Sequence, residues 1–165
     1  MGAPGTEAKE LRFAADKMLG RLARWLRILG QDVIYGSHLS GHGLIRAARK
    51  EGRVILTRDR RIVKAANLPE HLFIESDHFR EQLKQVARAF QLDPGEKLFT
   101  RCAECNSVLE RIAKESVKDQ VPPYVFSTQE KFSLCRRCRR IYWPATHVEK
   151  MIQELRALGI EPPGK

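Results

Sequence analysis

The sequence predicts an α/β fold with a parallel sheet between layers of helices, followed by a small cysteine-containing module and a C-terminal helix. Three observations lead to this prediction. Apolar strand-like runs alternate with helical patterns up to about residue 93, which is typical of a parallel sheet with crossover helices. Two C-x-x-C pairs then follow. The 165 residues, 42% of them hydrophobic, are enough for one packed domain and a small satellite.

The alternation predicts each element in turn. Met18 to Leu29 has apolar residues at helical spacing and stops at Gly30, a typical C-terminal signal. Further helices are predicted at 44–50, shortly before Pro69, and at 79–90, and strands at 11–15, 32–35, 54–57 and 72–74. We therefore expect a disordered leader (1–10), an α/β domain (11–93), a cysteine module (97–145) and a final helix (146–160).

The two C-x-x-C pairs predict a zinc site. Cys102 and Cys105 form one pair, and Cys135 and Cys138 form the other. Two such turns brought together make a tetrahedral thiolate site for one structural zinc ion. The alternatives are two disulfides or cysteines that only fill a core. No secretory signal precedes them, so we expect a cytoplasmic protein with reduced thiols.

The insert between the cysteine pairs predicts a zinc ribbon of short strands and turns. Pro122 and Pro123 interrupt it, and Tyr124–Phe126 and Ile141–Trp143 supply residues typical of strands. A segment of this size depends on its metal for folding energy.

The charge predicts an anionic partner. Thirty Lys and Arg against 20 Asp and Glu give a formal net charge of +10. Charge alone does not separate nucleic acid from an anionic membrane surface. No apolar run reaches the roughly 20 residues that a membrane helix needs, so we expect no membrane span.

Three aspartates follow predicted strands directly or closely: Asp16, Asp59 and Asp77. The carboxyl ends of parallel strands share one edge of the sheet, where ligands bind. Clustered carboxylates are typical ligands of Mg²⁺ or Mn²⁺, and such ions can promote phosphodiester cleavage. The alternative is that each aspartate is a helix N-cap, for which Asp is a favoured residue.

Four basic residues on the first predicted helix suggest a route for phosphates. Lys17, Arg21, Arg24 and Arg27 recur every three or four residues, with no acidic residue among them. They form either a phosphate-binding ridge or a solvated helix face.

Several motifs in order resemble the PIN-related Mut-seven C-terminal ribonuclease family. They are FAADKMLGRLARWLRILGQDV, EGRVILTRDRRI, RCAECN, VPPYVF and CRRCRRIYWPATHVEKM, and the similarity runs from about Phe13 to Met151. The resemblance implies a PIN-like three-layer α/β/α fold with a C-terminal zinc ribbon. It also implies metal-dependent cleavage of RNA, with Asp16, Asp59 and Asp77 at the acidic positions.

The sequence departs from this family pattern in one place. A carboxylate is expected near the start of the helix after the second strand, where Ser40, Gly41, His42 and Gly43 stand instead. Imidazole prefers softer metals than Mg²⁺. The departure favours an alternative function, a non-catalytic RNA-binding or ribonucleoprotein-binding protein with part of its metal site lost.

The leading interpretation is a metal-dependent ribonuclease acting on single-stranded or structured RNA. In it Arg58 and Arg60, which flank Asp59, bind phosphate, or else they are only surface charges. Tyr142 and Trp143 lie close to Arg139 and Arg140, a composition typical of base-stacking surfaces. For Trp143 we expect packing of the ribbon against the first domain, and for Tyr142 both alternatives stay open.

Overall fold

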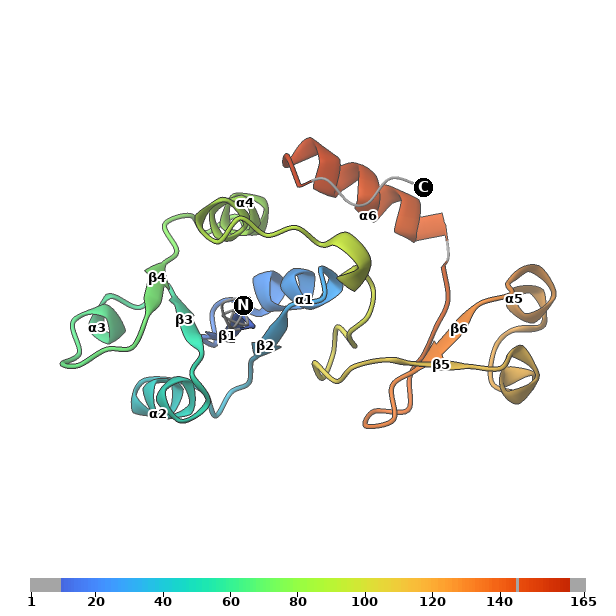
Figure 1. Cartoon of the computed structure of the whole chain (residues 1–165), viewed down its shortest axis with the longest axis horizontal. Helices are drawn as coiled ribbons and strands as arrows, with labels where there is room; N and C mark the ends of the chain where they lie inside the picture. Colours follow the sequence, from blue (N-terminus) through green and yellow to red (C-terminus); the bar gives the residue numbers. More distant parts are fainter. Residues whose placement is uncertain (1–9, 145, 161–165) are drawn as a thin grey trace, which may run out of the picture.

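A computed structural model describes residues 10–144 and 146–160, and it confirms the α/β prediction (Figure 1). The predicted leader lies outside these residues apart from Glu10. Four parallel strands form one sheet in the order β2-β1-β3-β4. Their bounds are Arg12–Ala15 for β1, Asp32–Ile34 for β2, Val54–Thr57 for β3 and His71–Phe73 for β4.

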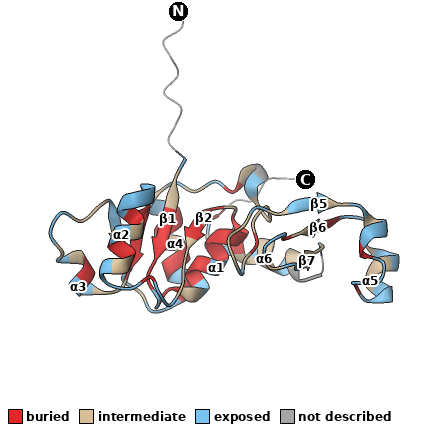
Figure 2. Cartoon of the chain, turned by 90° about the horizontal axis from the view of Figure 1, so that it is seen from below, coloured by how far each residue is buried: buried red, intermediate tan, exposed pale blue. Residues whose placement is uncertain are grey.

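Helices cover both faces of the sheet, which gives three layers. Helices α1 (Gly20–Ile28) and α4 (Phe79–Ala89) pack against one face, around a core that includes Phe13, Leu26 and Leu83. Helix α2 (His42–Glu51) and the short α3 (Arg60–Val63) cover the other. Buried residues concentrate in these layers (Figure 2).

Gly30 ends α1 for a specific structural reason. Its φ is +84°, a left-handed conformation that glycine adopts without strain. A Cβ at this position would lie 2.2 Å from the main-chain oxygen of Lys97. The close approach brings the end of α1 against the segment that leads into the ribbon.

The cysteine module contains a three-stranded antiparallel sheet of order β5-β6-β7. Its strands are β5 (Glu110–Ile112), β6 (Phe132–Leu134) and β7 (Ile141–Tyr142), and 3-10 turns lie at Gly95–Lys97 and Lys114–Val117. The module has its own small core around Val117, Val121 and Phe132.

One prediction for the module was wrong. Tyr124–Phe126 belongs to helix α5 (Pro123–Thr128) and not to a strand. Pro123 is the first helical residue, where a missing N–H costs nothing and the fixed φ favours helix formation. The second proline therefore begins a helix, although the side chains that follow it are typical of strands.

The last helix, α6 (Thr146–Ala157), belongs to the α1 and α4 layer. Leu155 is buried in the main core, with Met151 and Leu158 packed against it. Glu154 forms an ion pair with Arg80 of α4. None of the helices in the described residues is long and apolar enough to span a bilayer.

Candidate functional site

The four cysteines converge on one point as predicted. Their sulfurs all lie within 4.8 Å of one another, and all four cysteines are free thiols. Sγ of Cys102 lies 3.5 Å from Sγ of Cys138, and Sγ of Cys105 lies 3.3 Å from Sγ of Cys135. Tetrahedral zinc at about 2.3 Å from each sulfur requires sulfur separations of about 3.8 Å. The cluster is therefore able to bind zinc.

The thiols differ in their acidity. Burial raises the pKa of Cys135 to about 12. Burial also acts to raise the pKa of Cys105, but hydrogen bonds with the hydroxyl and main chain of Ser107 outweigh it and lower this pKa to about 6. The Tyr142 hydroxyl lies 3.0 Å from Sγ of Cys102, and its pKa is raised by burial and by this contact. The Tyr142 hydroxyl thus contacts the cysteine cluster from one side.

The first cysteine turn is docked on the open edge of the parallel sheet. Edge strand β2 donates a hydrogen bond from the Val33 amide to Oδ1 of Asn106, at 3.0 Å. Arg27 of α1 donates to the main-chain oxygens of Ala103 and Glu104, each at 3.1 Å. The side chains of Arg27 and Asn106 therefore join the α/β layers to the cysteine module.

Arg27 consequently does not belong to an exposed basic ridge. It is 5% exposed, and its Nε donates to the Val33 oxygen at 3.0 Å. Burial lowers the pKa of Arg27, partly offset by the acidic groups around it. The helical spacing had placed it among the phosphate-binding candidates, but its side chain reaches into the domain junction.

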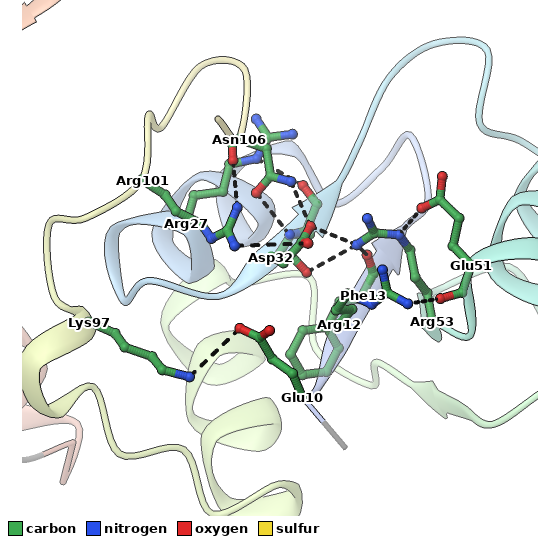
Figure 3. Close-up of polar contacts among 11 residues, drawn as sticks. Glu10, Arg12, Phe13, Arg27, Asp32, Glu51, Arg53, Lys97, Arg101 and Asn106 are labelled. Atoms are coloured by element: carbon green, nitrogen blue, oxygen red, sulfur yellow. Dashed lines mark hydrogen bonds and ion pairs between the residues drawn. The ribbon is translucent and has the colours of Figure 1, made fainter. Parts of the chain in front are cut away.

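Asp32 is the centre of a partly buried polar network at the same junction (Figure 3). Its Oδ1 accepts hydrogen bonds from Arg53 Nη1 and Asn106 Nδ2, both at 2.7 Å, and Arg101 lies 3.9 Å away. Arg53 also binds the main-chain oxygen of Phe13 and pairs with Glu51. Burial opposes ionisation, but the Arg53 and Asn106 hydrogen bonds outweigh it and hold the pKa of Asp32 below its usual range.

At the opposite, carboxyl end of the sheet, Asp16 and Asp59 are linked through Thr57. Thr57 Oγ1 donates to Asp16 Oδ2 at 2.6 Å and accepts from the Asp59 amide at 2.9 Å. Asp16 follows β1 and Asp59 lies beyond β3, its direct neighbour in the sheet. Topology therefore brings two of the three predicted carboxylates to one short stretch of the sheet edge.

Asp16 is 2% exposed, and the groups that donate hydrogen bonds to its carboxylate are uncharged. Besides Thr57, its carboxylate accepts hydrogen bonds from the amides of Met18 and Arg58, both at 2.8 Å. No Lys or Arg side chain among the described residues forms an ion pair with it. Three donors leave one of the roughly four acceptor positions of a carboxylate open.

Asp59 has the N-cap role that was the alternative interpretation. Its Oδ1 accepts from the Arg61 amide at 2.9 Å at the start of α3. The Arg61 guanidinium also pairs with it at 3.0 Å, and these hydrogen bonds lower the pKa of Asp59. Arg61 is exposed, so this pair is open to rearrangement.

A cavity of about 340 Å³ opens beside Asp59. Lys17, Arg61, Gly41 and His42, the first residue of α2, also line it. The region that lacks the expected carboxylate therefore faces the same space as Asp59. Arg61 was absent from the candidates predicted from sequence, although the TRDRR run contained it.

Asp77 lies apart from this cavity. It follows β4, its side chain is 80% exposed, and it forms an ion pair with His78 at 3.6 Å. It lines a different hollow together with Met18, Arg21 and Phe79. Among the described residues, the four cysteines are the only group of His, Cys, Asp or Glu close enough to share a metal ion. The structure thus brings Asp16 and Asp59 near each other but does not assemble all three carboxylates.

The other basic candidates lie at varied positions. Arg21 covers the Phe79 ring at 3.8 Å, and Arg24 pairs with Glu104 at 2.7 Å. Arg58 is half-buried and donates to the main-chain oxygen of Ile74 at 3.0 Å, whereas exposed Arg60 lies over the Phe73 ring. Of the predicted phosphate contacts, only Lys17 lines the cavity beside Asp59.

Trp143 packs differently from the prediction. Its ring lies 6.3 Å from that of Phe132, centroid to centroid, and it joins the core of the cysteine module itself. It also lines a cavity shared with α1 and α6.

Comparison with known proteins identifies the family. The model of the Mut7-C RNAse domain matches residues 11–155, which include the parallel sheet, both cysteine turns and most of α6. No curated protein and no solved structure matches the chain. The family match covers most of the sequence, and the chain belongs to the Mut7-C RNAse domain family.

Proposed function

We propose that this protein is a metal-dependent ribonuclease that hydrolyses RNA phosphodiester bonds in the cytoplasm. The observation that carries the proposal is the Asp16–Thr57–Asp59 linkage at the carboxyl edge of the sheet in a chain of an RNase domain family. Parallel α/β sheets bind ligands at this edge. The substrate is RNA, single-stranded or structured.

Asp16 and Asp59 are the proposed ligands of a catalytic Mg²⁺ or Mn²⁺, with Asp77 as a third. Their carboxylate oxygens are the hard donors that these ions prefer. The buried Asp16 carboxylate has no cationic partner among the described residues, so a divalent ion would compensate its charge. Asp59 fits the same role once the exposed Arg61 side chain moves from it to a phosphate. Such an ion would activate water and stabilise the leaving oxygen.

Basic residues around the cavity bind the substrate in this proposal. Lys17 and Arg61 line the cavity beside Asp59, so their charges attract the phosphate next to the scissile bond. Exposed Arg21 and Arg24 extend this surface along α1, and Arg58 and Arg60 flank Asp59. These cations also offset the repulsion between carboxylates and the RNA backbone.

The cysteine cluster has a structural role in the proposal. Four cysteines complete a tetrahedral site, which leaves no position for water or substrate on a zinc ion. Bound zinc would fix the first cysteine turn, and Arg27 and Asn106 then hold this turn against β2.

One observation favours the alternative of an RNA-binding protein without catalytic activity. Among the described residues, no group of three carboxylates lies close enough together to share a metal ion. Gly41 and His42 also stand where an acidic residue is expected. A binding protein would keep the basic surface and the cysteine module, and would use Asp16 only as an acceptor of hydrogen bonds from Met18, Thr57 and Arg58.

An RNA cleavage assay separates the two functions. Wild type should cleave RNA in Mn²⁺, more weakly in Mg²⁺, and not without a divalent ion. Asp16→Asn and Asp59→Asn should each abolish cleavage while RNA binding persists. Asp119→Asn is the control. Asp119 is exposed on the cysteine module and lines neither the cavity beside Asp59 nor the hollow with Asp77.

A restored carboxylate adds an independent arm to this assay. His42→Asp is the better choice, because Gly41 has a φ of +52° that disfavours other residues. Asp at the first position of α2 also suits the helix dipole. If the missing acidic residue limits metal binding, His42→Asp should increase cleavage in Mg²⁺. Equal inactivity of wild type, Asp16→Asn and His42→Asp in every divalent ion would favour the binding protein.

A further inference from the structure

A second cavity, of about 290 Å³, lies where α1, α6 and the sheet of the cysteine module meet. Figure 1 shows α1, α6 and the strands β5 and β6 of this sheet. Its apolar walls include Ile28 of α1, Met151 of α6, and Tyr142 and Trp143 at β7. Asp16, Asp59 and Asp77 do not line it. It is therefore separate from the proposed catalytic crevice, by which we mean Asp16 together with the cavity beside Asp59 and the hollow with Asp77.

The sheet of the module presents one polar row to this cavity. Arg111 of β5 is paired in register with Ser133 of β6, and Ser133 with Tyr142 of β7. Adjacent strands direct residues in register to the same face, and all three residues line the cavity. A cation, a hydroxyl and an aromatic ring are therefore aligned across its wall.

The described residues around the cavity include four cations and no acidic side chain: Arg24, Arg101, Arg111 and Lys131. Arg24 is neutralised by Glu104 at 2.7 Å, and Arg101 Nη1 donates to the Asn106 oxygen at 2.9 Å. Arg111 and Lys131 are exposed, and neither forms an ion pair with a described residue. Two uncompensated positive charges thus stand beside an apolar, aromatic space.

We propose that this cavity binds one nucleotide of a single-stranded RNA, with its base against Tyr142 and Trp143 and its phosphate on Arg111 and Lys131. The proposal rests on the ribonuclease function and adds a second RNA contact to it. The volume of about 290 Å³ lies just below the usual range for small-molecule sites, about 300–1,000 Å³, so the cavity suits one nucleotide and not a longer segment. Aromatic side chains beside cations are the usual means of holding single-stranded bases.

Exposed cations on and just before α1 lie between this site and the cavity beside Asp59. Lys17 lines the cavity beside Asp59, Arg21 lines the hollow with Asp77, and Arg24 lines the nucleotide cavity. Arg21 and Arg24, three residues apart, lie on one side of α1, and Lys17 lies just before the helix begins. Helix α1 is about 12 Å long between Gly20 and Ile28. An RNA strand that occupies both the nucleotide cavity and the catalytic crevice therefore follows this side of α1.

The test uses the full zinc-loaded chain and a ten-nucleotide RNA that contains 4-thiouridine, without Mg²⁺ or Mn²⁺. Photocrosslinks mapped by peptide mass spectrometry should include Tyr142 or Trp143. In parallel, fluorescence anisotropy measures RNA affinity against salt for Arg111→Gln/Lys131→Gln. The control Arg88→Gln/Lys118→Gln removes the same charge from exposed positions outside the cavity.

The expected result is an affinity about tenfold lower for Arg111→Gln/Lys131→Gln. The slope of log affinity against log salt should also fall by about 0.7, the contribution of one phosphate contact to a single strand. The control variant should match wild type in both quantities.

Crosslinks confined to crevice residues, or an Arg111→Gln/Lys131→Gln variant that matches its control, would overturn the cavity proposal and leave the ribonuclease proposal intact. Failure of the catalytic proposal alone gives a different set of results. If crosslinks form at Tyr142 or Trp143 but wild type cleaves no RNA in any divalent ion, the nucleotide site stands and the catalytic proposal fails.

Discussion

The side chain of Asn106 takes the place of a neighbouring strand for Val33, whose amide donates to Asn106 Oδ1 at 3.0 Å. Val33 lies on β2, at the edge of the parallel sheet. An unpaired edge exposes main-chain donors that must find partners. The first cysteine turn supplies that partner, so the sheet edge and the cysteine cluster depend on each other.

Asn106→Gly should lower the free energy of unfolding by about 1–3 kcal/mol, because it leaves the Val33 amide and one Asp32 oxygen without this partner. Glycine keeps the left-handed backbone, since φ of Asn106 is +74°. The control is Asn67→Gly, at an exposed residue with φ of +54°. Chemical denaturation of the zinc-loaded proteins measures both, and equal effects would contradict a docking role for Asn106.

Arg27→Gln should destabilise the fold by more than about 2 kcal/mol, because three main-chain oxygens lose a buried donor. Arg24→Gln, one turn away, should cost less than about 1 kcal/mol, because it breaks an exposed ion pair. Thermal unfolding compares the two variants. A stable Arg27→Gln protein with weakened RNA binding would show instead that Arg27 belongs to the phosphate-binding surface.

The purified protein should contain about one zinc ion per chain by elemental analysis, and Cys135→Ser should unfold the cysteine module. Zinc affinity should fall as the pH falls, because bound thiols must lose their protons and burial raises the pKa of Cys135 to about 12. Competition with a chromophoric chelator at several pH values measures this. A metal-free protein with two disulfides would exclude the zinc site.

Asp32 should make the free energy of unfolding depend on pH. Its pKa is lowered in the folded state, so its contribution is complete above its unfolded pKa of about 3.9 and is lost as pH falls through the folded value. Asp32→Asn should therefore be less stable than wild type at pH 7, with a gap that narrows below about pH 4. Denaturation from pH 7 to pH 3 measures the gap. A gap that is constant over this range would exclude the Asp32–Arg53 pairing.

Local sequence patterns predicted helices and strands well where the residues of one element alone determine its structure. Strand 54–57 is buried throughout and was predicted residue for residue, and Gly30 marked the end of α1. The four cysteines identified their cluster by spacing alone. Pro123 misled because proline interrupts a strand and also begins a helix.

Contacts between distant segments were beyond these patterns. Helical spacing placed Arg27 with three other cations, and only the position of the first cysteine turn shows that it is buried. Asp32, Arg53 and Asn106 lie in three separate motifs, and nothing in any one of them indicates their pairing. For the same reason, the ends of strands predicted three neighbouring carboxylates, whereas the structure links Asp16 with Asp59 and leaves Asp77 exposed.

The most direct test of the catalytic proposal asks whether Asp16 binds metal or only accepts hydrogen bonds from Met18, Thr57 and Arg58. Electron paramagnetic resonance of free Mn²⁺ measures binding to the zinc-loaded protein. We expect wild type and Asp119→Asn to bind Mn²⁺, and Asp16→Asn to bind it with an affinity at least about tenfold lower. Equal Mn²⁺ binding by wild type and Asp16→Asn, or none by either, would contradict it.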